Sequence, residues 1–356
     1  MTNLEDLPIR NDLKGLKPYG APQLDVPVQL NVNENTFGIP EAVAIDIIQE
    51  LATEVIKLNR YPDREFLELR GAFASYLGQG LRAEQVWAAN GSNEIITQIF
   101  QAFGGPGKTA LSFGPTYSMY PNIARITLTE YQELPRLEDF QLTAEYVANK
   151  LAELKPSIVL LCNPNNPTGT PIDNSVISAA YDAFDGILVV DEAYAEFSSQ
   201  DSAMQLLSGR PRLIVSRTMS KAFAFAGARV GYLAADEAIV DALRIVRLPY
   251  HLSALTQAAA RAALRHSDLM LANVEQIKVQ RDRMIAQLET MGLRAFASDA
   301  NFVLVEGFKD PHQIFEALLA KGIIVRNVGI PNTLRITAGT ESETTRLLGE
   351  LALILG

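Results

Sequence analysis

Three short apolar runs, rich in β-branched residues, occur in succession, and a polar residue follows each of them. Residues 158–161 precede Asn166, residues 187–190 precede Asp191, and residues 213–215 precede Lys221. The gaps of 25 and 30 residues between these polar residues leave room for a crossover helix between parallel strands. Because parallel strands end at the same edge of a sheet, we expect the three side chains at the edge where open α/β sheets bind ligands.

A lysine, an aspartate and a phosphate cradle are the groups that pyridoxal 5'-phosphate requires of a protein. The lysine holds the cofactor as a Schiff base, and the acid pairs with the pyridinium nitrogen so that the ring can accept electrons. Lys221 and Asp191 are of the right types for these two tasks. Taken singly, a lysine after a strand is usually a solvated loop residue, and an aspartate there could be a helix cap or a turn residue, so their occurrence together is what favours the cofactor.

The phosphate of such a cofactor needs backbone donors and positive charge. The chain around Ser92 has the composition of a strand end, a glycine turn and a helix start. A helix N-terminus binds anions, and Ser92 and Asn93 can both cap the helix and contact a phosphate. Ser220 and Arg229 lie in the lysine segment and can reach the same group. Tyr117 follows another apolar run, where its ring can lie on the cofactor.

These motifs occur in the order found in the fold-type I, aspartate-aminotransferase-like enzymes that use pyridoxal phosphate. The chain resembles that family from about Tyr19 to Arg335. The resemblance implies an α/β fold with a large domain, whose mostly parallel sheet lies between helices, and a smaller C-terminal α/β domain. We predict an N-terminal arm at residues 1–40, the large cofactor domain at residues 41–245 and the small domain at residues 246–356.

The resemblance also implies roles for individual residues. Lys221 would form the covalent bond to the cofactor, and Asp191 would pair with its pyridinium nitrogen. Asn166 and Tyr194 would hydrogen-bond the ring oxygen, with Tyr194 counted among the catalytic residues. Arg229 would bind the cofactor phosphate.

Within that family the chain resembles the histidinol-phosphate aminotransferases in its motifs at residues 19–22, 33–35, 216–221 and 247–252. The resemblance implies histidinol phosphate and glutamate or 2-oxoglutarate as small-molecule substrates. Because histidinol phosphate has no carboxylate, the same cationic groups must bind its phosphate and the carboxylate of glutamate. Arg335 is the best candidate for that task, with Arg326 beside it. Tyr19, Asn166 and Tyr250 would complete the substrate site.

Three positions mark how far the resemblance extends. Tyr61 matches a tyrosine that such enzymes donate across a dimer interface to the cofactor site, which implies a homodimer. Thr36 stands where relatives usually have proline, so the geometry of that loop is open. Asn93 stands where many relatives carry an acid, so we assign its contact to the backbone in preference to the side chain.

Composition fits a metabolic enzyme and disfavours several other classes. The 356 residues are 48% hydrophobic, which is enough for two cores. A net charge of -10 argues against nucleic acid as a partner, and we expect no membrane partner because no apolar stretch approaches spanning length. Cys162 is the single cysteine, which fits a reducing cytoplasm without disulfides. The three histidines are scattered, so we predict no metal site.

Three alternative functions stay open at this point. An aromatic amino-acid aminotransferase would use the same scaffold, and a phosphothreonine-type decarboxylase would share the cofactor. A more distant alternative is a hydrolase that uses Ser220 with Lys221, or a metal held by Asp191, Glu192 and Glu196. For Glu192 and Glu196 themselves, we favour ordinary exposed helix acids.

Overall fold

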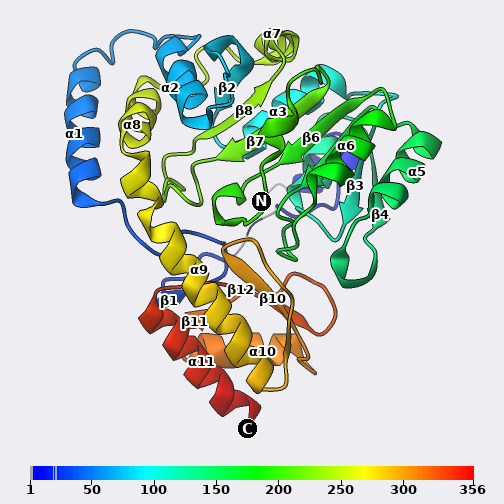
Figure 1. The fold of residues 1–356 in the computed structure, drawn as a ribbon, viewed down its shortest axis with the longest axis vertical. Helices are drawn as coiled ribbons and strands as arrows, with labels where there is room; N and C mark the ends of the chain where they lie inside the picture. Colours follow the sequence, from blue (N-terminus) through cyan, green and yellow to red (C-terminus); the bar gives the residue numbers. More distant parts are fainter. Residues whose placement is uncertain (1–2, 19, 21) are drawn as a thin grey trace.

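A seven-stranded sheet forms the centre of the larger part of the molecule in this computed structural model, which describes residues 3–18, 20 and 22–356 (Figure 1). The strands, in their order across the sheet, are β2 (Val86–Ala89), β8 (Gly231–Ala235), β7 (Leu213–Thr218), β6 (Ile187–Asp191), β5 (Ile158–Cys162), β3 (Thr109–Gly114) and β4 (Glu130–Pro135). Strand β8 is antiparallel to both of its neighbours, and all other adjacent pairs are parallel. The predicted α/β fold with a mostly parallel sheet is confirmed.

The register of the sheet places the predicted polar residues side by side. Asp191, at the end of β6, is paired with Cys162 at the end of β5 and with Ser216 near the end of β7. Strands β5 and β6 are buried throughout, and their successive side chains contribute to cores on opposite faces. Val189 belongs to one core, whereas Leu188 and Val190 belong to the other.

Helices cover both faces of this sheet. One core is shared with α1 (Glu41–Val55), α2 (Leu67–Leu77), α3 (Ser92–Phe103), α4 (Met119–Ile126), α7 (Glu237–Val246) and α8 (Ala254–Arg265). The opposite core is shared with α5 (Ala144–Leu154) and α6 (Asn174–Asp182). Short 3-10 helices lie at Leu4–Asp6, Asn11–Leu13, Ala83–Gln85, Glu138–Phe140, Ala195–Phe197 and Ala203–Leu206. In the described chain, no helix is both long enough and apolar enough to cross a membrane.

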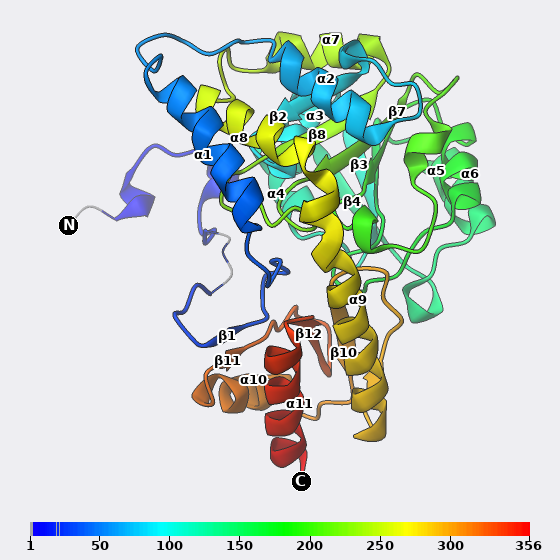
Figure 2. The ribbon, with the colours of Figure 1, turned by 60° about the vertical axis from the view of Figure 1, so that its left-hand side comes forward.

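The smaller part is built on two small sheets below the large one (Figures 1 and 2). Strand β10 (Phe302–Glu306) lies between the antiparallel strands β12 (Thr333–Thr337) and β9 (Arg294–Ala295). Strand β1 (Val28–Gln29) of the N-terminal segment pairs in parallel with β11 (Ile323–Ile324). The helices of this part are α9 (Ser267–Thr290), α10 (Pro311–Ala320) and α11 (Glu341–Leu355).

Helix α9 leads from the larger part to the smaller part (Figure 2). Met270 still packs in the core under the large sheet, whereas Val274 and Ile277 pack in the core of the small sheets. Helix α8 packs against α1 and α2 of the larger part. The domain boundary after residue 245 stays a prediction, and these contacts place the change of core further along, within α9.

Candidate active site

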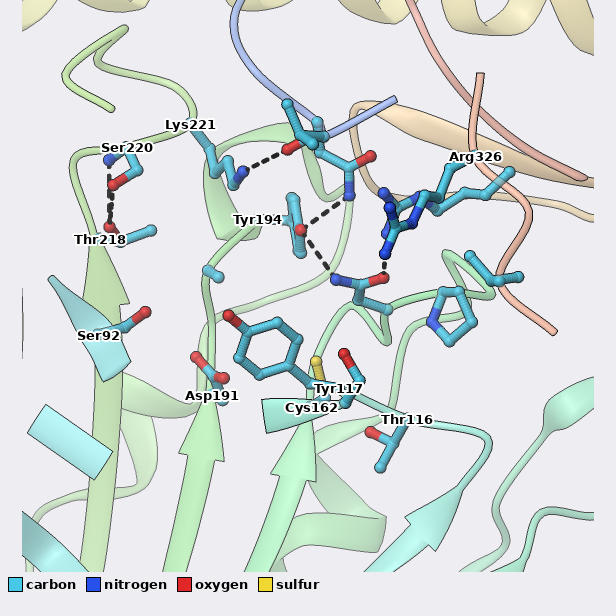
Figure 3. A pocket seen from close by; sticks show the side chains of 18 of the residues that line it. Ser92, Thr116, Tyr117, Cys162, Asp191, Tyr194, Thr218, Ser220, Lys221 and Arg326 are labelled. Carbon is cyan, nitrogen blue, oxygen red and sulfur yellow. Dashed lines mark hydrogen bonds between the residues drawn. The ribbon is translucent and has the colours of Figure 1, made fainter. Parts of the chain in front are cut away.

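A cavity of about 410 Å³ opens at the carboxyl ends of β5, β6 and β7, and β12 of the smaller part contributes to its wall. Figure 3 shows Lys221, Tyr194, Asp191 and Tyr117 around a common space. Eleven of the predicted site residues line this cavity: Ser92, Asn93, Tyr117, Asn166, Asp191, Tyr194, Ser220, Lys221, Arg229, Arg326 and Arg335. Tyr61 and Tyr250 are not among the lining residues of this chain, and Tyr19 lies outside the described residues.

Lys221 stands in the cavity among other cations. Its Nζ donates a hydrogen bond to the main-chain oxygen of Val32 at 3.0 Å. Burial, together with the charges of Arg335 and Arg229, lowers the pKa of Lys221 to about 7, and Glu34 opposes this shift. A lysine with a pKa near 7 is unprotonated in a substantial fraction of molecules at neutral pH, and the free amine is the form that attacks a carbonyl or accepts a proton.

Asp191 is buried at the floor of the cavity and is held by hydroxyl groups. Tyr120 of α4 donates to Oδ2 at 2.9 Å, and Ser216 of β7 donates to Oδ1 at 3.2 Å. Burial raises the pKa of Asp191 to about 6, although these two hydrogen bonds favour the ionised form. Among the residues that the structure describes, the hydrogen-bond donors to this carboxylate are neutral hydroxyls, so it suits a positively charged nitrogen of a ligand.

A donor-rich cradle lies where α3 begins. Gly91 precedes the helix with φ +86°, and a Cβ at that position would lie 2.5 Å from Nη2 of Arg229. A Cβ on Gly231 would lie 2.3 Å from the backbone nitrogen of Ser92. Position 91 therefore needs glycine because of its positive φ, and position 231 needs it because β8 approaches the backbone of the helix N-terminus closely. Arg229 Nη1 also donates to Ser220 Oγ at 3.5 Å.

The chemistry of this cradle fits a phosphate group. Backbone N–H groups of the first turn of α3, the hydroxyls of Ser92 and Ser220, and the guanidinium of Arg229 border the same end of the cavity. An anion with several acceptor oxygens gains both hydrogen bonds and a favourable helix dipole in such a place. The residues present thus fit pyridoxal phosphate, with Lys221 and Asp191 available for its aldehyde carbon and its ring nitrogen.

A second network surrounds the hydroxyl of Tyr194. Asn166 Nδ2 donates to Tyr194 Oη at 3.2 Å, and Arg335 Nη1 donates to Asn166 Oδ1 at 2.7 Å. Arg335 also donates through Nη2 to the main-chain oxygen of Asn31 at 2.7 Å. Arg326 lies next to Arg335, since the two residues exchange main-chain hydrogen bonds of 3.0 and 2.8 Å. Two adjacent guanidinium groups make this end of the cavity suitable for anions.

Asn93 contacts the cavity through its side chain. Tyr117 Oη donates to Asn93 Oδ1 at 3.0 Å, so the amide contributes to the placement of the tyrosine ring. The sequence-based expectation assigned the contact of Asn93 to its backbone. The structure adds a side-chain contact to that expectation, and the role of either contact toward a ligand stays a prediction.

The expectation that Glu192 and Glu196 are exposed helix acids was wrong. Glu192 is only 1% exposed, and its Oε2 accepts hydrogen bonds from Nε and Nη2 of Arg217 at 3.0 and 2.8 Å. Ser202 Oγ and the backbone nitrogen of Ala203 also donate to the same carboxylate. Glu196 has a side chain that is 7% exposed and lies 3.6 Å from Arg217 Nη1. These partners occupy Glu192, which leaves little room for a metal at the set proposed with Asp191.

Sequence reasoning missed several residues that the fold brings to the site. Tyr120 lies three residues after Tyr117, a helical spacing that offered a signal. Ser216 is the first polar residue after the apolar run of β7, which was a weaker signal. Asn33 Nδ2 donates to the hydroxyl of Tyr194, and Thr337 Oγ1 donates to Asn33 Oδ1. No local pattern links residues 33 and 337, because they lie so far apart in the chain.

Comparison with known proteins supplies the family. Residues 26–351 match the family model described as aminotransferase class I and II. The chain belongs to this aminotransferase family. A histidinol-phosphate aminotransferase of Paenarthrobacter aurescens is 56% identical over 360 residues, which cover 100% of this chain and 97% of the relative. A histidinol-phosphate aminotransferase of Frankia casuarinae is 51% identical over 358 residues, which cover 98% of this chain and 90% of the relative. These matches confirm the resemblance inferred from the motifs.

Solved aminotransferase structures have the same fold. A histidinol-phosphate aminotransferase from Sinorhizobium meliloti, in complex with pyridoxal-5'-phosphate, superimposes with a TM-score of 0.88 at 24% identity, covering 98% of this chain and 97% of that one. An L-threonine-O-3-phosphate decarboxylase from Porphyromonas gingivalis reaches a TM-score of 0.80 at 21% identity, with coverages of 92% and 99%. The fold alone therefore does not separate the two reactions. Family membership makes this aminotransferase dependent on pyridoxal phosphate.

Proposed function

We propose that this aminotransferase transfers the amino group between L-histidinol phosphate and 2-oxoglutarate, as a step of histidine biosynthesis in the cytoplasm. The observation that carries the substrate is the pair of adjacent arginines, Arg326 and Arg335, in the same cavity as Lys221. Two cations at one end of the cavity suit both the phosphate of histidinol phosphate and a carboxylate of glutamate. The identity to relatives that carry this activity in their names supports the same substrate.

The proposed mechanism assigns proton transfer to Lys221 and charge stabilisation to Asp191. When bound, pyridoxal phosphate supplies an electron sink for the carbon that loses its proton. Lys221 Nζ, with a pKa lowered to about 7 by burial, is suited to take the proton from the substrate Cα and to return it. Asp191 would hold the ring nitrogen of the cofactor through its carboxylate, whose two oxygens are oriented by Tyr120 and Ser216.

The remaining residues are proposed to bind and orient. Around the cofactor, this set comprises Ser92, Asn93, Ser220 and Arg229 at the phosphate, Tyr117 on the ring, and Asn166 and Tyr194 at the ring oxygen. Around the substrate, it comprises Asn166, Arg326, Arg335, Tyr250 and Tyr19. With Lys221, Asp191 and Tyr61 the proposed site has fourteen residues, and the placement of eleven of them around one cavity supports the assignment.

Absorption spectroscopy tests the reaction and the substrate together. Protein loaded with pyridoxal phosphate should show a visible band that histidinol phosphate bleaches in a single turnover, while phenylalanine in a parallel cuvette bleaches it far more slowly. Faster bleaching by phenylalanine would move the function to aromatic amino acids. Release of carbon dioxide would indicate a decarboxylase. Single-turnover rates of Arg326→Met and Arg335→Met with histidinol phosphate and with glutamate would show which arginine serves which acidic group.

We further propose that the enzyme is a homodimer in which Tyr61 enters the partner's cavity. Tyr61 is 80% exposed and stacks on Tyr250 with ring centroids 4.4 Å apart, outside the cavity of its own chain. Large apolar side chains are exposed on α1, on the loop after it, at the end of α7 and just beyond it: Ile45, Ile48, Val55, Ile56, Leu58, Ile245 and Leu248. An exposed apolar surface of this kind suits a second copy of the chain.

Subunit mixing tests this proposal. Tyr61→Ala and Lys221→Ala should each be poorly active alone. A mixed dimer restores one complete site, because the Tyr61→Ala subunit keeps its lysine and receives Tyr61 from the Lys221→Ala subunit. Recovered activity after mixing is the expected result, together with a dimer mass in light scattering. A monomer mass, or no recovery although mixed dimers form, would contradict it.

A further inference from the structure

The hydroxyl of Tyr194 accepts two amide hydrogen bonds inside the cavity. Asn33 Nδ2 donates to Tyr194 Oη at 3.0 Å, and Asn166 Nδ2 donates to it at 3.2 Å (Figure 3). A tyrosine hydroxyl has one proton and two lone pairs. With both lone pairs engaged by amides, the hydroxyl can act only as a donor, in its remaining direction.

The orientations of the two amides follow from their other partners. Arg335 has only donors, so Asn166 Oδ1 must face its Nη1, and the Asn166 amide nitrogen faces Tyr194. Thr337 Oγ1 accepts from the backbone N–H of Asn33 at 3.1 Å and therefore turns its own proton to Asn33 Oδ1, also at 3.1 Å. The amide nitrogen of Asn33 is thereby directed to Tyr194.

The backbone holds Asn33 in this place. Its φ of +57° lies in the left-handed region, which asparagine and aspartate tolerate better than most residues. Asn301 also holds the backbone of Asn33 in place, because its Nδ2 donates to the main-chain oxygen of Asn33 at 3.1 Å. Asn33 and Thr337 are both buried, at 1% and 2% exposure. The N-terminal segment and β12 thus meet the large sheet at the Tyr194 hydroxyl.

We propose that Asn33 and Thr337 are positioning residues that act through Tyr194, fixing its hydroxyl as a hydrogen-bond donor to the ring oxygen of the cofactor. This inference rests on the proposed function, since it takes pyridoxal phosphate and the ring-oxygen contact of Tyr194 from there. Tyr194 stays protonated for this task because burial raises its pKa above the ordinary value, although Arg335 and Asn33 oppose that shift.

The donor has a spectroscopic consequence in the loaded protein. In the loaded protein, the visible spectrum would report the titration of the proton held between the ring oxygen of the cofactor and the nitrogen of Lys221. A hydrogen bond from Tyr194 to that oxygen weakens its hold on the proton, so it lowers the pH midpoint of the visible-band transition. Loss of one hydrogen bond to a charged oxygen should raise the midpoint by about one pH unit.

A double-variant cycle measures whether Asn33 acts through Tyr194. The four proteins are the wild type, Asn33→Asp, Tyr194→Phe and the double variant, each loaded with pyridoxal phosphate and titrated by its visible spectrum. The Asn33→Asp change keeps the oxygen that accepts from Thr337 but replaces the amide donor with an acceptor, so the Tyr194 proton turns away from the cofactor. We expect the midpoint to rise by about one unit in the wild-type background and by much less in the Tyr194→Phe background.

The Asn33→Asp change also adds a negative charge, which could itself shift the midpoint. Variants of Thr337 that add no charge control for this effect. Thr337→Val frees the Asn33 amide to rotate and should also raise the midpoint, whereas Thr337→Ser keeps the hydroxyl and should restore the wild-type value. An Asn33→Asp shift of equal size with and without Tyr194, or no shift in either Asn33→Asp or Thr337→Val, would overturn the inference. Failure of the proposed function looks different: no visible band forms on adding the cofactor, or Tyr194→Phe leaves the midpoint unchanged.

Discussion

Asp191 and Glu192 are neighbours in the chain, yet they lie in two opposite kinds of environment. Asp191 accepts hydrogen bonds from two neutral hydroxyls, those of Tyr120 and Ser216, and burial raises its pKa to about 6. Glu192 is bound by the guanidinium of Arg217 at 2.8 Å and by further donors. The first carboxylate is left for a ligand to neutralise, whereas the second is neutralised within the protein.

The cations of the same region repeat this contrast. Lys221 and Arg217 lie four residues apart on the segment that includes β7. Burial and two arginines lower the pKa of Lys221 to about 7. Burial also disfavours the charge of Arg217, but Glu192 and Glu196 outweigh burial and raise its pKa. A charge that the fold leaves without a counter-ion is available for chemistry, and a charge that the fold pairs contributes to structure.

The largest effect expected from this contrast is loss of catalysis at Lys221. Lys221→Ala removes the amine that binds the cofactor and moves the proton, so turnover should fall by more than about 10⁴-fold. Circular dichroism and the unfolding transition should remain those of a folded protein. Lys150→Ala, which changes an exposed lysine paired with Glu153 on α5, is the matched control and should keep full activity. Wild-type turnover in Lys221→Ala would remove the lysine from the mechanism.

Removing the cation that pairs with the buried glutamates should destabilise the fold. Arg217→Met leaves Glu192 and Glu196 buried without their cation, so the free energy of unfolding should fall by about 3 to 5 kcal/mol. Denaturant titration of the cofactor-free protein measures this change. Adding Glu192→Gln to Arg217→Met should recover part of the loss. Arg244→Met, which removes an arginine whose side chain is 44% exposed, should cost under about 1 kcal/mol. Equal losses in the two arginine variants would contradict the contrast.

Removing the charge of the unpaired carboxylate, Asp191, should raise the free energy of unfolding, whereas breaking the buried ion pair lowers it. A folded pKa of about 6, above the ordinary 3.8, means that the folded state binds more protons than the unfolded state between these values. The free energy of unfolding therefore decreases as pH rises through that window, and the ionised carboxylate costs stability above it. Asp191→Asn should stabilise the cofactor-free protein by about 3 kcal/mol above pH 7 and by almost nothing near pH 4.

Unfolding titrations at several pH values check this prediction. Glu192→Gln is the informative companion, because removing the charge of a paired carboxylate should destabilise the protein over the same pH range. The loaded Asp191→Asn enzyme should still bind the cofactor but react roughly 10² to 10³ times more slowly. If Asp191→Asn destabilised the cofactor-free protein equally at all pH values, Asp191 would belong with Glu192 as a structural acid.

The sequence predicted much of the site because its signals were local. The polar residues after the apolar runs lie at one sheet edge, and eleven predicted residues line one cavity. The difference between Asp191 and Glu192 was not predictable in this way. It depends on the register of β6 against β7, which places Ser216 next to Asp191 and brings Arg217 to Glu192. The approach of Tyr120 likewise depends on how α4 packs against the sheet.

Contacts between distant segments account for the rest of what the sequence did not reveal. Asn33 and Thr337 are 304 residues apart and meet only because the N-terminal segment lies along the small sheets. Tyr61 and Tyr250 come together on the surface of one chain, outside the cavity, and the role predicted for Tyr61 depends on a second copy. Pairings of this kind follow from tertiary packing and have no periodic trace in the sequence.

The smallest effect on stability is expected from a hydrogen bond that involves neither the unpaired charges of Asp191 and Lys221 nor the paired charges of Glu192 and Arg217. Thr36 donates through Oγ1 to Glu343 Oε2, and that carboxylate also accepts from the backbone N–H of Thr340 at 2.8 Å. Thr36→Val removes one of several bonds to the carboxylate, so the free energy of unfolding should fall by about 1 kcal/mol with turnover unchanged. Thr36→Ser should retain the stability. If Thr36→Val lost as much free energy of unfolding as Arg217→Met, a single neutral donor would stabilise the fold as much as a buried ion pair. The contrast between paired and unpaired charges would then not explain the stability of this protein.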